Sequence, residues 1–226
     1  MRPNRVRRLL CTALLLAPLA MAAGCVNPFK PADPQLPSGD IVPENFGTPE
    51  EVLETMRVGI VSRSVNGGDA YLHAFAESTA LGDRAFRAFY DPAVKATWQS
   101  VNQLTAPEPW DLALERNLPQ KLDDIRPTSP EYIFQWAQDP DFPLDPPITG
   151  DTAQIHRKYT LFARISGGED IEIIGIGFAD LSLQKERSGR WSIFRWQDRV
   201  DPAVGVNPAE TDQRTFSWWR LESLTR

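Results

Sequence analysis

The sequence predicts an α+β fold, with helices in the first part of one domain and a mostly antiparallel sheet in the last part. Two observations lead to this prediction. A capped helix pattern opens at Thr48, and the last third holds consecutive strand patterns: an alternating one at 154–165, a long apolar one at 171–184 and another at 191–198. Helix-period segments followed by consecutive strands are typical of the α+β class.

The first helix has a strong start signal. Thr48-Pro49-Glu50-Glu51 places Thr at the N-cap, Pro at the first helical position and Glu at the third, which is a capping box. The apolar residues that follow share one helical face: Val52, Leu53, Met56 and Ile60. We expect this helix to run to about Ser64 and to end before Asn66-Gly67-Gly68.

The next elements are shorter. Asp69 is expected to cap a second helix, and residues 85–91 alternate loosely and predict a short strand. Thr105-Ala106-Pro107-Glu108 repeats the capping-box pattern, so a third helix carrying Trp110 is expected, kinked or split at Pro119.

The last third predicts strands. Residues 132–134 are strand-like and precede an Asp- and Pro-rich loop at 139–147. Residues 154–165 place Tyr159 on the apolar face of a strand and His156 on the opposite face.

Residues 171–184 form a long apolar strand whose Gly175 and Gly177 suit a strongly bent sheet. Ser188-Gly189 is a hairpin turn, and residues 191–198 and 216–221 are expected as two further strands.

These elements resemble the nuclear transport factor 2-like superfamily over roughly residues 49–224. The resemblance rests on the capped opening helix, the short second helix, the Trp-led third helix and the closing hairpin Ser-Gly-Arg-Trp-Ser-Ile-Phe-Arg-Trp-Gln-Asp at 188–198. It implies a strongly curved, mostly antiparallel sheet wrapped by N-terminal helices into a cone. It does not specify an activity, because the superfamily includes isomerases, dehydratases, polyketide cyclases, binding modules and secretion-system scaffolds. The segment between Asp91 and Gln154 is longer than in compact members.

The first 24 residues predict an export signal. Arg2, Arg5, Arg7 and Arg8 precede an apolar stretch at 9–23 that is too short to span a bilayer. The small residues Ala22-Ala23-Gly24 before Cys25 resemble the lipobox of bacterial lipoproteins. We therefore expect cleavage between Gly24 and Cys25 and lipidation of Cys25; the alternative is an ordinary cleaved signal in which Cys25 happens to follow the cut.

The predicted organisation is a signal peptide at 1–24, a lipidated Cys25 with a Pro-rich tether to residue 48, and one domain at 49–226. The tether holds five prolines and few apolar side chains, so it cannot bury enough surface to order itself. At about 3.1 Å per residue it would reach roughly 70 Å. The 178 residues from 49 onward suit one domain.

Charge limits the partners. The chain has a net charge of −6, and removing the four arginines of the signal leaves 20 basic and 30 acidic residues. No basic run remains, so nucleic acid is not expected as a partner. The expected attachment to the membrane is through the lipid. Val26 in place of Asp after the lipidated Cys favours the outer membrane under the sorting rule of enterobacteria.

Most catalytic chemistries find no support in the sequence. There is no Gly-x-Ser-x-Gly elbow, and the mature part holds no Cys other than Cys25. His73 and His156 stand outside metal-ligand spacings, and prolines interrupt the Asp139, Asp141 and Asp145 cluster, so no metal and no cofactor are expected. General acid–base chemistry is the remaining enzymatic option. Its candidates are Asp198, at the end of a Trp-rich strand, and Tyr159.

The chain is rich in tryptophan, with seven residues. Large aromatic side chains fill a curved core, so the core is their first interpretation, and a pocket wall or an interface is the second. The candidates for a pocket or interface are Trp110, Trp196, Trp218 and Trp219. As neighbours on an expected strand, Trp218 and Trp219 would face opposite sides, exposing one.

The function expected from these observations is a lipid-anchored envelope protein that acts as a non-enzymatic binding or scaffold module. A homodimer or an envelope protein partner would bind through the sheet. The alternative is a small-molecule isomerase or hydro-lyase that uses a buried carboxylate or Tyr in the cone. A deep cavity with a buried carboxylate would favour the enzyme, and a cavity filled by aromatic side chains would favour the scaffold.

Overall fold

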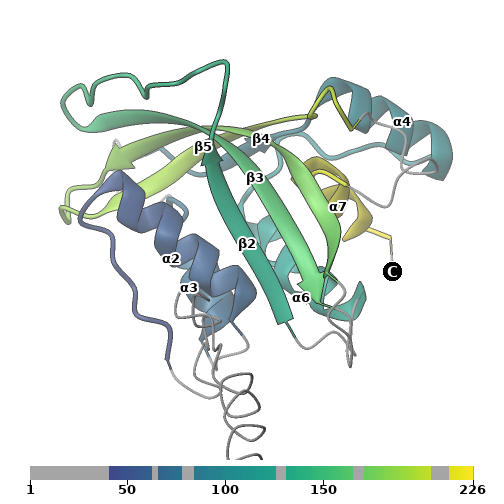
Figure 1. The fold of residues 1–226 in the computed structure, drawn as a ribbon, viewed down its shortest axis with the longest axis horizontal. Coiled ribbons are helices and arrows are strands. Elements are labelled where there is room, and N and C mark those ends of the chain that lie inside the picture. The colour runs from purple at the N-terminus through teal and green to yellow at the C-terminus, as the bar shows by residue number, and fades with distance from the viewer. Residues whose placement is uncertain are drawn as a thin grey trace, which may run out of the picture. The chain divides into compact units, whose positions relative to one another are not determined.

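Five strands form one mixed sheet in the order β1-β5-β4-β3-β2. The computed structural model describes residues 41–62, 66–77, 84–125, 131–164, 171–204 and 214–225. The expected signal peptide, Gly24, Cys25 and most of the expected tether lie outside the described residues. Figure 1 shows a strongly bent sheet with α2 (Pro49–Val61) and α3 (Gly67–His73) beside its concave side.

The opening helix follows its sequence signal. The Thr48 hydroxyl accepts from Glu51 N, and the Glu51 carboxylate accepts from Thr48 N, so the predicted capping box is present. Helix α2 ends at Val61, three residues before the expected end. Helix α3 begins at Gly67 after Asn66, so Asp69 lies in its first turn and is not the N-cap that the sequence predicted.

The segment before α2 packs onto the helices. Val42 is buried, and its amide donates to Asn66 Oδ1 at 2.8 Å. The amide of Asn45 donates to Thr55 Oγ1 at 3.0 Å. The packed residues therefore begin upstream of Pro49, inside the stretch that was expected to belong to the tether.

The middle of the chain differs most from its expected structure. Helix α4 (Pro92–Asn102) was not predicted, although Asp91 caps it by accepting from the amides of Ala93 and Val94. The expected helix start at Thr105 is wrong, because residues 103–110 contain no helix and α5 (Leu112–Glu115) begins after its own N-cap, Asp111. Helix α6 (Asn117–Ile125) follows, so the break falls before Pro119.

The predicted strands at 85–91, 132–134, 154–165, 171–184 and 191–198 are confirmed with adjusted ends. They are β1 (Arg87–Phe89), β2 (Glu131–Gln138), β3 (Thr152–Arg164), β4 (Ile171–Lys185) and β5 (Trp191–Arg199). Strand β1 pairs with β5 in parallel, and the other pairs are antiparallel.

The long strand β4 bends where two glycines come close to other groups. An added Cβ at Gly175 would lie 3.2 Å from Leu161 Cβ, and one at Gly177 would lie 2.5 Å from the Tyr159 hydroxyl. The ladder between β3 and β4 also shifts register between Leu161 and Phe162. Both glycines therefore mark close backbone approach in a bent sheet, as predicted.

The last predicted strand is wrong. Residues Phe216–Glu222 form the helix α7, which begins after Thr215, whose hydroxyl accepts from Trp218 N. Helix α7 packs against α4, α6 and β4. A short apolar run is compatible with a strand or a buried helix, and here burial on all sides selects the helix.

The predicted α+β class is confirmed by these elements. One hydrophobic core joins the inner face of the sheet to all the helices around it, and its largest fully buried side chains include Trp98, Trp110 and Trp196. Across the described ranges, no helix has both the length and the apolar character needed to cross a bilayer.

Candidate functional site

The two predicted catalytic residues lie together in the core. Tyr159 is on β3 and Asp198 is near the end of β5, and both side chains are fully buried. The Tyr159 hydroxyl donates to Asp198 Oδ1 at 2.8 Å. Sequence reasoning therefore named a pair of residues that the fold brings into direct contact.

Both groups also hold the start of α7. The amide of Phe216 donates to the Tyr159 hydroxyl at 2.9 Å, and the amide of Ser217 donates to Asp198 Oδ2 at 2.6 Å. The first amides of a helix have no partner within the helix, and a buried helix start needs others to satisfy them. Tyr159 and Asp198 supply these partners, and the carboxylate also suits the positive end of the helix dipole.

Burial shifts the titration of both groups. It raises the pKa of the Asp198 carboxyl, although the Arg220 charge and the hydrogen bonds from Ser217 and Tyr159 act in the opposite direction. Burial also raises the pKa of the Tyr159 hydroxyl far above its usual value, and the Asp198 carboxylate adds to this effect. Burial thus favours the neutral form of each group more than water would.

A second buried cluster adjoins this pair and was missed by sequence reasoning. Arg220 on α7 forms a two-point ion pair with Glu115, with distances of 2.8 and 2.9 Å. Tyr71 and the Trp110 indole also donate to the Glu115 carboxylate. No local motif connects Glu115 with Arg220, which are 105 residues apart, so only the tertiary fold could reveal the pair.

Arg220 connects the two clusters. Its guanidinium lies over the Trp196 ring at 4.4 Å and 5.7 Å from the centre of the Phe216 ring. The neighbouring Glu115 raises the pKa of Arg220 further although burial opposes it, so the group stays charged. Inside the core, the Arg220 charge is therefore paired with Glu115 and stacked on Trp196.

Aromatic rings fill the space around Tyr159. Its ring lies 4.9 Å from Phe216, 6.3 Å from Trp136 and 6.5 Å from Trp196 between ring centres. The described residues also form surface hollows of about 440, 500 and 300 Å³, and neither Tyr159 nor Asp198 lines any of these three. The space around this pair is filled by aromatic side chains.

The four tryptophans proposed for a pocket or interface are core residues. Trp110 and Trp196 are fully buried, and Trp218 and Trp219 are exposed by only 5 and 4%. The expectation that one of Trp218 and Trp219 points outward is wrong, because they lie on a helix that is enclosed by other elements. The Trp219 indole donates to the Ile174 carbonyl at 3.1 Å.

Charged residues near the β2–β3 loop form ion pairs with one another. Asp139 and Asp180 both contact Arg199, and Asp145 pairs with Arg157. His156 lies on the opposite face from Tyr159, as predicted, and its Nδ1 is 2.8 Å from Asp180 Oδ1. Within the described ranges no cluster of three or more His, Cys, Asp or Glu side chains could hold a metal ion.

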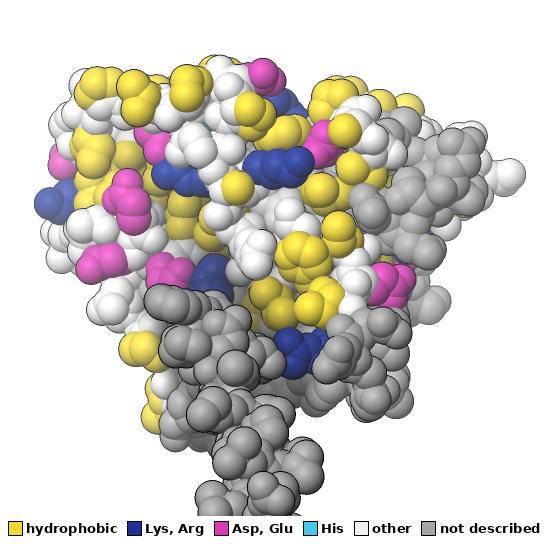
Figure 2. All heavy atoms as spheres, in the orientation of Figure 1, with side chains coloured by type: hydrophobic (Ala, Val, Ile, Leu, Met, Phe, Trp, Pro, Cys, Tyr) yellow, Lys and Arg dark blue, Asp and Glu magenta, His cyan; other side chains and the backbone are white. Residues whose placement is uncertain are grey.

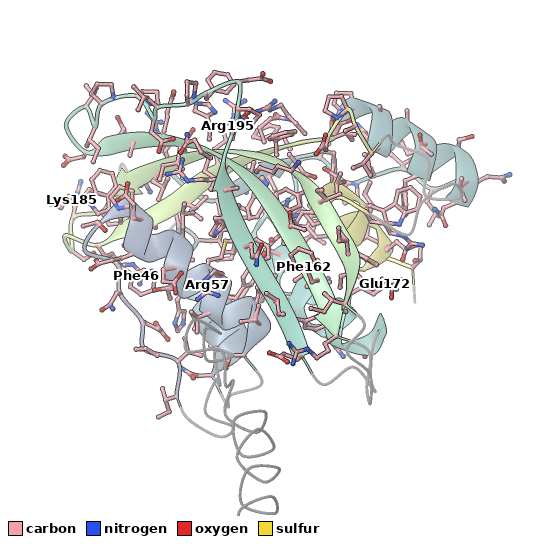
Figure 3. All side chains as sticks on the ribbon, viewed as in Figure 1. Phe46, Arg57, Phe162, Glu172, Lys185 and Arg195 are labelled. Atoms are coloured by element: carbon pink, nitrogen blue, oxygen red, sulfur yellow. The ribbon has the colours of Figure 1, made fainter. Side chains whose placement is uncertain are left out.

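The outer face of the sheet carries an apolar patch. Ile133, Phe162 and Ile173 follow one another in register across β2, β3 and β4, with Ile171 and Ile176 adjacent on β4. We call these five residues the sheet patch. They are half-buried except Ile171, which is 49% exposed. Figure 2 shows hydrophobic side chains gathered over this part of the sheet, around the position where Figure 3 labels Phe162.

Comparisons with known proteins identify similar folds only. No family model and no curated protein matches the chain. A protein of unknown function from Mycobacterium tuberculosis is 16% identical and aligns over 77% of this chain and 83% of its own, with a TM-score of 0.46. A nuclear transport factor 2-like protein with a cystatin-like fold from Novosphingobium aromaticivorans is 9% identical over 70% of this chain and 83% of its own, also at 0.46.

A third structure, provisionally described as a scytalone dehydratase from Novosphingobium aromaticivorans, is 11% identical. It aligns over 67% of this chain and 80% of its own, with a TM-score of 0.44. At these TM-scores the likenesses carry no argument about activity, ligand or partner, which must come from the chain's own residues.

Proposed function

We propose that this chain is a lipid-anchored envelope protein whose folded domain is a non-enzymatic binding or scaffold module. One observation carries the non-enzymatic part of the proposal. The two residues that the sequence offered as acid–base candidates, Asp198 and Tyr159, are fully buried and bond the first amides of α7. A general acid or base must reach a proton of the substrate, which this enclosed pair does not do.

The sheet patch supports the binding part of the proposal. A contiguous apolar surface on a folded domain is typical of a site for another protein. The rim of the patch is polar, because Arg164 and Glu131 form an ion pair at the same end of the sheet. The proposed partner at this surface is a second copy of the chain or an envelope protein.

The anchoring part of the proposal rests on the sequence around Cys25. The basic start, the apolar stretch and the small residues before Cys25 support lipidation at that residue, and Val26 supports the outer membrane as its location. Two or three acyl chains would give lasting attachment, which one chain would not.

The anchor is tested by replacing Cys25. Cys25→Ala is expected to release the full chain into the soluble fraction and to abolish labelling by an alkyne-tagged fatty acid. Cys11→Ala is the matched control, because Cys11 lies within the expected signal and its replacement should leave labelling unchanged. Labelling that survives Cys25→Ala would reject the anchor.

The binding surface is tested by photo-crosslinking in cells. A photoreactive amino acid at Phe162 should crosslink to a second copy or to a discrete envelope protein, and one at Arg116, an exposed position on another part of the surface, should not. Equal crosslinking at both positions, or none at Phe162, would contradict the proposal. Turnover of a small carbonyl substrate by the full chain, abolished in a folded Asp198→Asn variant, would favour the isomerase or hydro-lyase.

A further inference from the structure

A surface hollow of about 440 Å³ lies on the solvent side of the sheet, away from the sheet patch. It is bounded by the end of the β2–β3 loop, by strands β3, β4 and β5, and by Arg84, three residues before β1. Its lining residues are Arg84, Pro146, Pro147, Thr149, Thr152, Ala153, Gln154, Ser182, Phe194 and Arg195. Its volume is within the range of sites that hold one small molecule.

The floor of this hollow is a row of polar groups held in register. Gln154 on β3 pairs with Ser182 on β4, and Ser182 pairs with Arg195 on β5. The row thus places an amide, a hydroxyl and a guanidinium side by side on three hydrogen-bonded strands. Figure 3 labels Arg195 near the β2–β3 loop, which supplies the other wall. Groups held by strands are better fixed for recognition than groups on loops.

The second arginine is also held in place. The backbone of Arg84 exchanges two hydrogen bonds with the Gln184 side chain, at 3.1 and 3.0 Å. Its guanidinium lies 4.7 Å from the centre of the Phe194 ring, and that of Arg195 lies 4.8 Å from the centre of the Phe89 ring. Stacking on a ring leaves the N–H groups at the edge of a guanidinium available to an oxygen-rich anion.

The hollow is lined by two positively charged arginines and, in the described ranges, by no negatively charged side chain. Among the residues that the structure describes, Arg84 and Arg195 form no ion pair, and no carboxylate lines the hollow. Seven other arginines in the described part of the chain are ion-paired: Arg57, Arg157, Arg164, Arg190, Arg199, Arg214 and Arg220. Arg87 is paired in register with Arg195 across β1 and β5, and its side chain donates to the Phe86 carbonyl, so like charges meet at paired positions.

We infer that this hollow binds a phosphorylated sugar. The two stacked guanidinium groups suit a phosphate monoester, since each can donate two parallel hydrogen bonds to its oxygens. Ser182, Gln154 and the two threonines offer donors and acceptors to sugar hydroxyls. The inference names a ligand class for the binding module proposed above and rests on that function.

Calorimetric titration of the full chain in detergent tests this inference. The probes are a hexose phosphate (glucose phosphorylated on its primary hydroxyl), glucose and inorganic phosphate. The hexose phosphate should bind about tenfold or more tightly than either fragment. Arg84→Gln and Arg195→Gln should each weaken it about tenfold or more, because each removes charge-assisted hydrogen bonds. Arg116→Gln, an exposed arginine outside the hollow, is the matched control and should leave affinity unchanged.

A second arm separates a soluble ligand from a lipid headgroup. Flotation with phosphatidylcholine vesicles, with and without a phosphorylated phosphatidylinositol, uses the same variants. If the protein binds the phosphorylated vesicles and Arg195→Gln abolishes this binding, the assignment extends to lipid headgroups. If it binds the hexose phosphate tightly but does not bind these vesicles, the ligand is a soluble one. Equal affinity for inorganic phosphate, or equal loss in Arg116→Gln, would overturn the inference. Such a failure, with crosslinking at Phe162 intact, would leave the scaffold function standing.

Discussion

Gly177 and Tyr159 are paired positions of β4 and β3, and the missing side chain of the glycine leaves room for the tyrosine hydroxyl. A Cβ at residue 177 would lie 2.5 Å from that hydroxyl and 2.8 Å from the Arg199 carbonyl oxygen. The hydroxyl can therefore reach both Asp198 and the start of α7. The absence of a side chain at Gly177 on β4 thus allows Tyr159 to hold the start of α7, although α7 lies about 40 residues further along the chain.

Gly177→Ala is expected to destabilise the domain by about 1–3 kcal/mol, because the added methyl group displaces the Tyr159 hydroxyl or the β5 backbone. The measurement is the midpoint of urea unfolding. Gly68→Ala is the matched control, since an added Cβ there meets nothing within 4 Å and Gly68 lies in α3. It should be neutral or stabilising by up to about 1 kcal/mol. Equal effects of the two substitutions would count against the close approach.

Tyr159→Phe is expected to cost about 1–3 kcal/mol of unfolding free energy, because it leaves the Phe216 amide and one Asp198 oxygen without a partner in a buried place. Tyr90→Phe is the comparison. The Tyr90 hydroxyl makes one bond of 3.2 Å to the Pro107 carbonyl, so about 0.5–1.5 kcal/mol is expected. A Tyr159→Phe protein as stable as the parent would show that the cap is dispensable.

The Glu115–Arg220 pair is suited to a double-mutant cycle. Arg220→Met alone is expected to destabilise by about 3–5 kcal/mol, because it leaves the Glu115 carboxylate buried without its cation. Glu115→Leu together with Arg220→Met should cost clearly less than the sum of the single changes. Thermal unfolding of the four proteins measures the cycle, and additive losses would indicate that the two charges act independently.

Alkaline pH is expected to unfold the domain through its buried tyrosines. Burial raises the pKa of Tyr71 and of Tyr159 well above that of an unfolded tyrosine, which is about 10. A folded-state pKa above the unfolded value means that stability is fully present below about pH 10 and falls as the pH rises beyond it. Circular dichroism and tyrosinate absorbance should change together in the parent. In Tyr159→Phe the slope of stability against pH should be shallower.

The sequence predicted the helices and strands that have strong local signals. The capping box at Thr48 and the alternation around Tyr159 identified α2 and β3, and the Gly-rich part of β4 identified the bend. Each of these signals depends only on residues that are close together in the sequence, so it can be recognised without the tertiary structure. Asp91-Pro92, a start signal of the same kind as Thr48-Pro49, marks α4 and was overlooked.

Other features depend on contacts between distant parts of the chain. The apolar run at 216–221 is too short for periodicity to separate strand from helix, and its helical form follows from enclosure by α4, α6 and β4. The pairing of Tyr159 with Asp198 was not derivable, although each residue was singled out. Their role in capping α7 could not be predicted while residues 216–221 were assigned to a strand.

Because Val42 is packed against the domain, the tether of the proposed membrane-bound form is shorter than the predicted tether to residue 48. Only 17 peptide links separate Cys25 from Val42, and a fully extended chain of that length spans at most about 60 Å. In the lipid-anchored form, every partner or ligand of the domain must therefore be present within a thin layer next to the leaflet. A target beyond that layer would have to be brought to the membrane by another molecule.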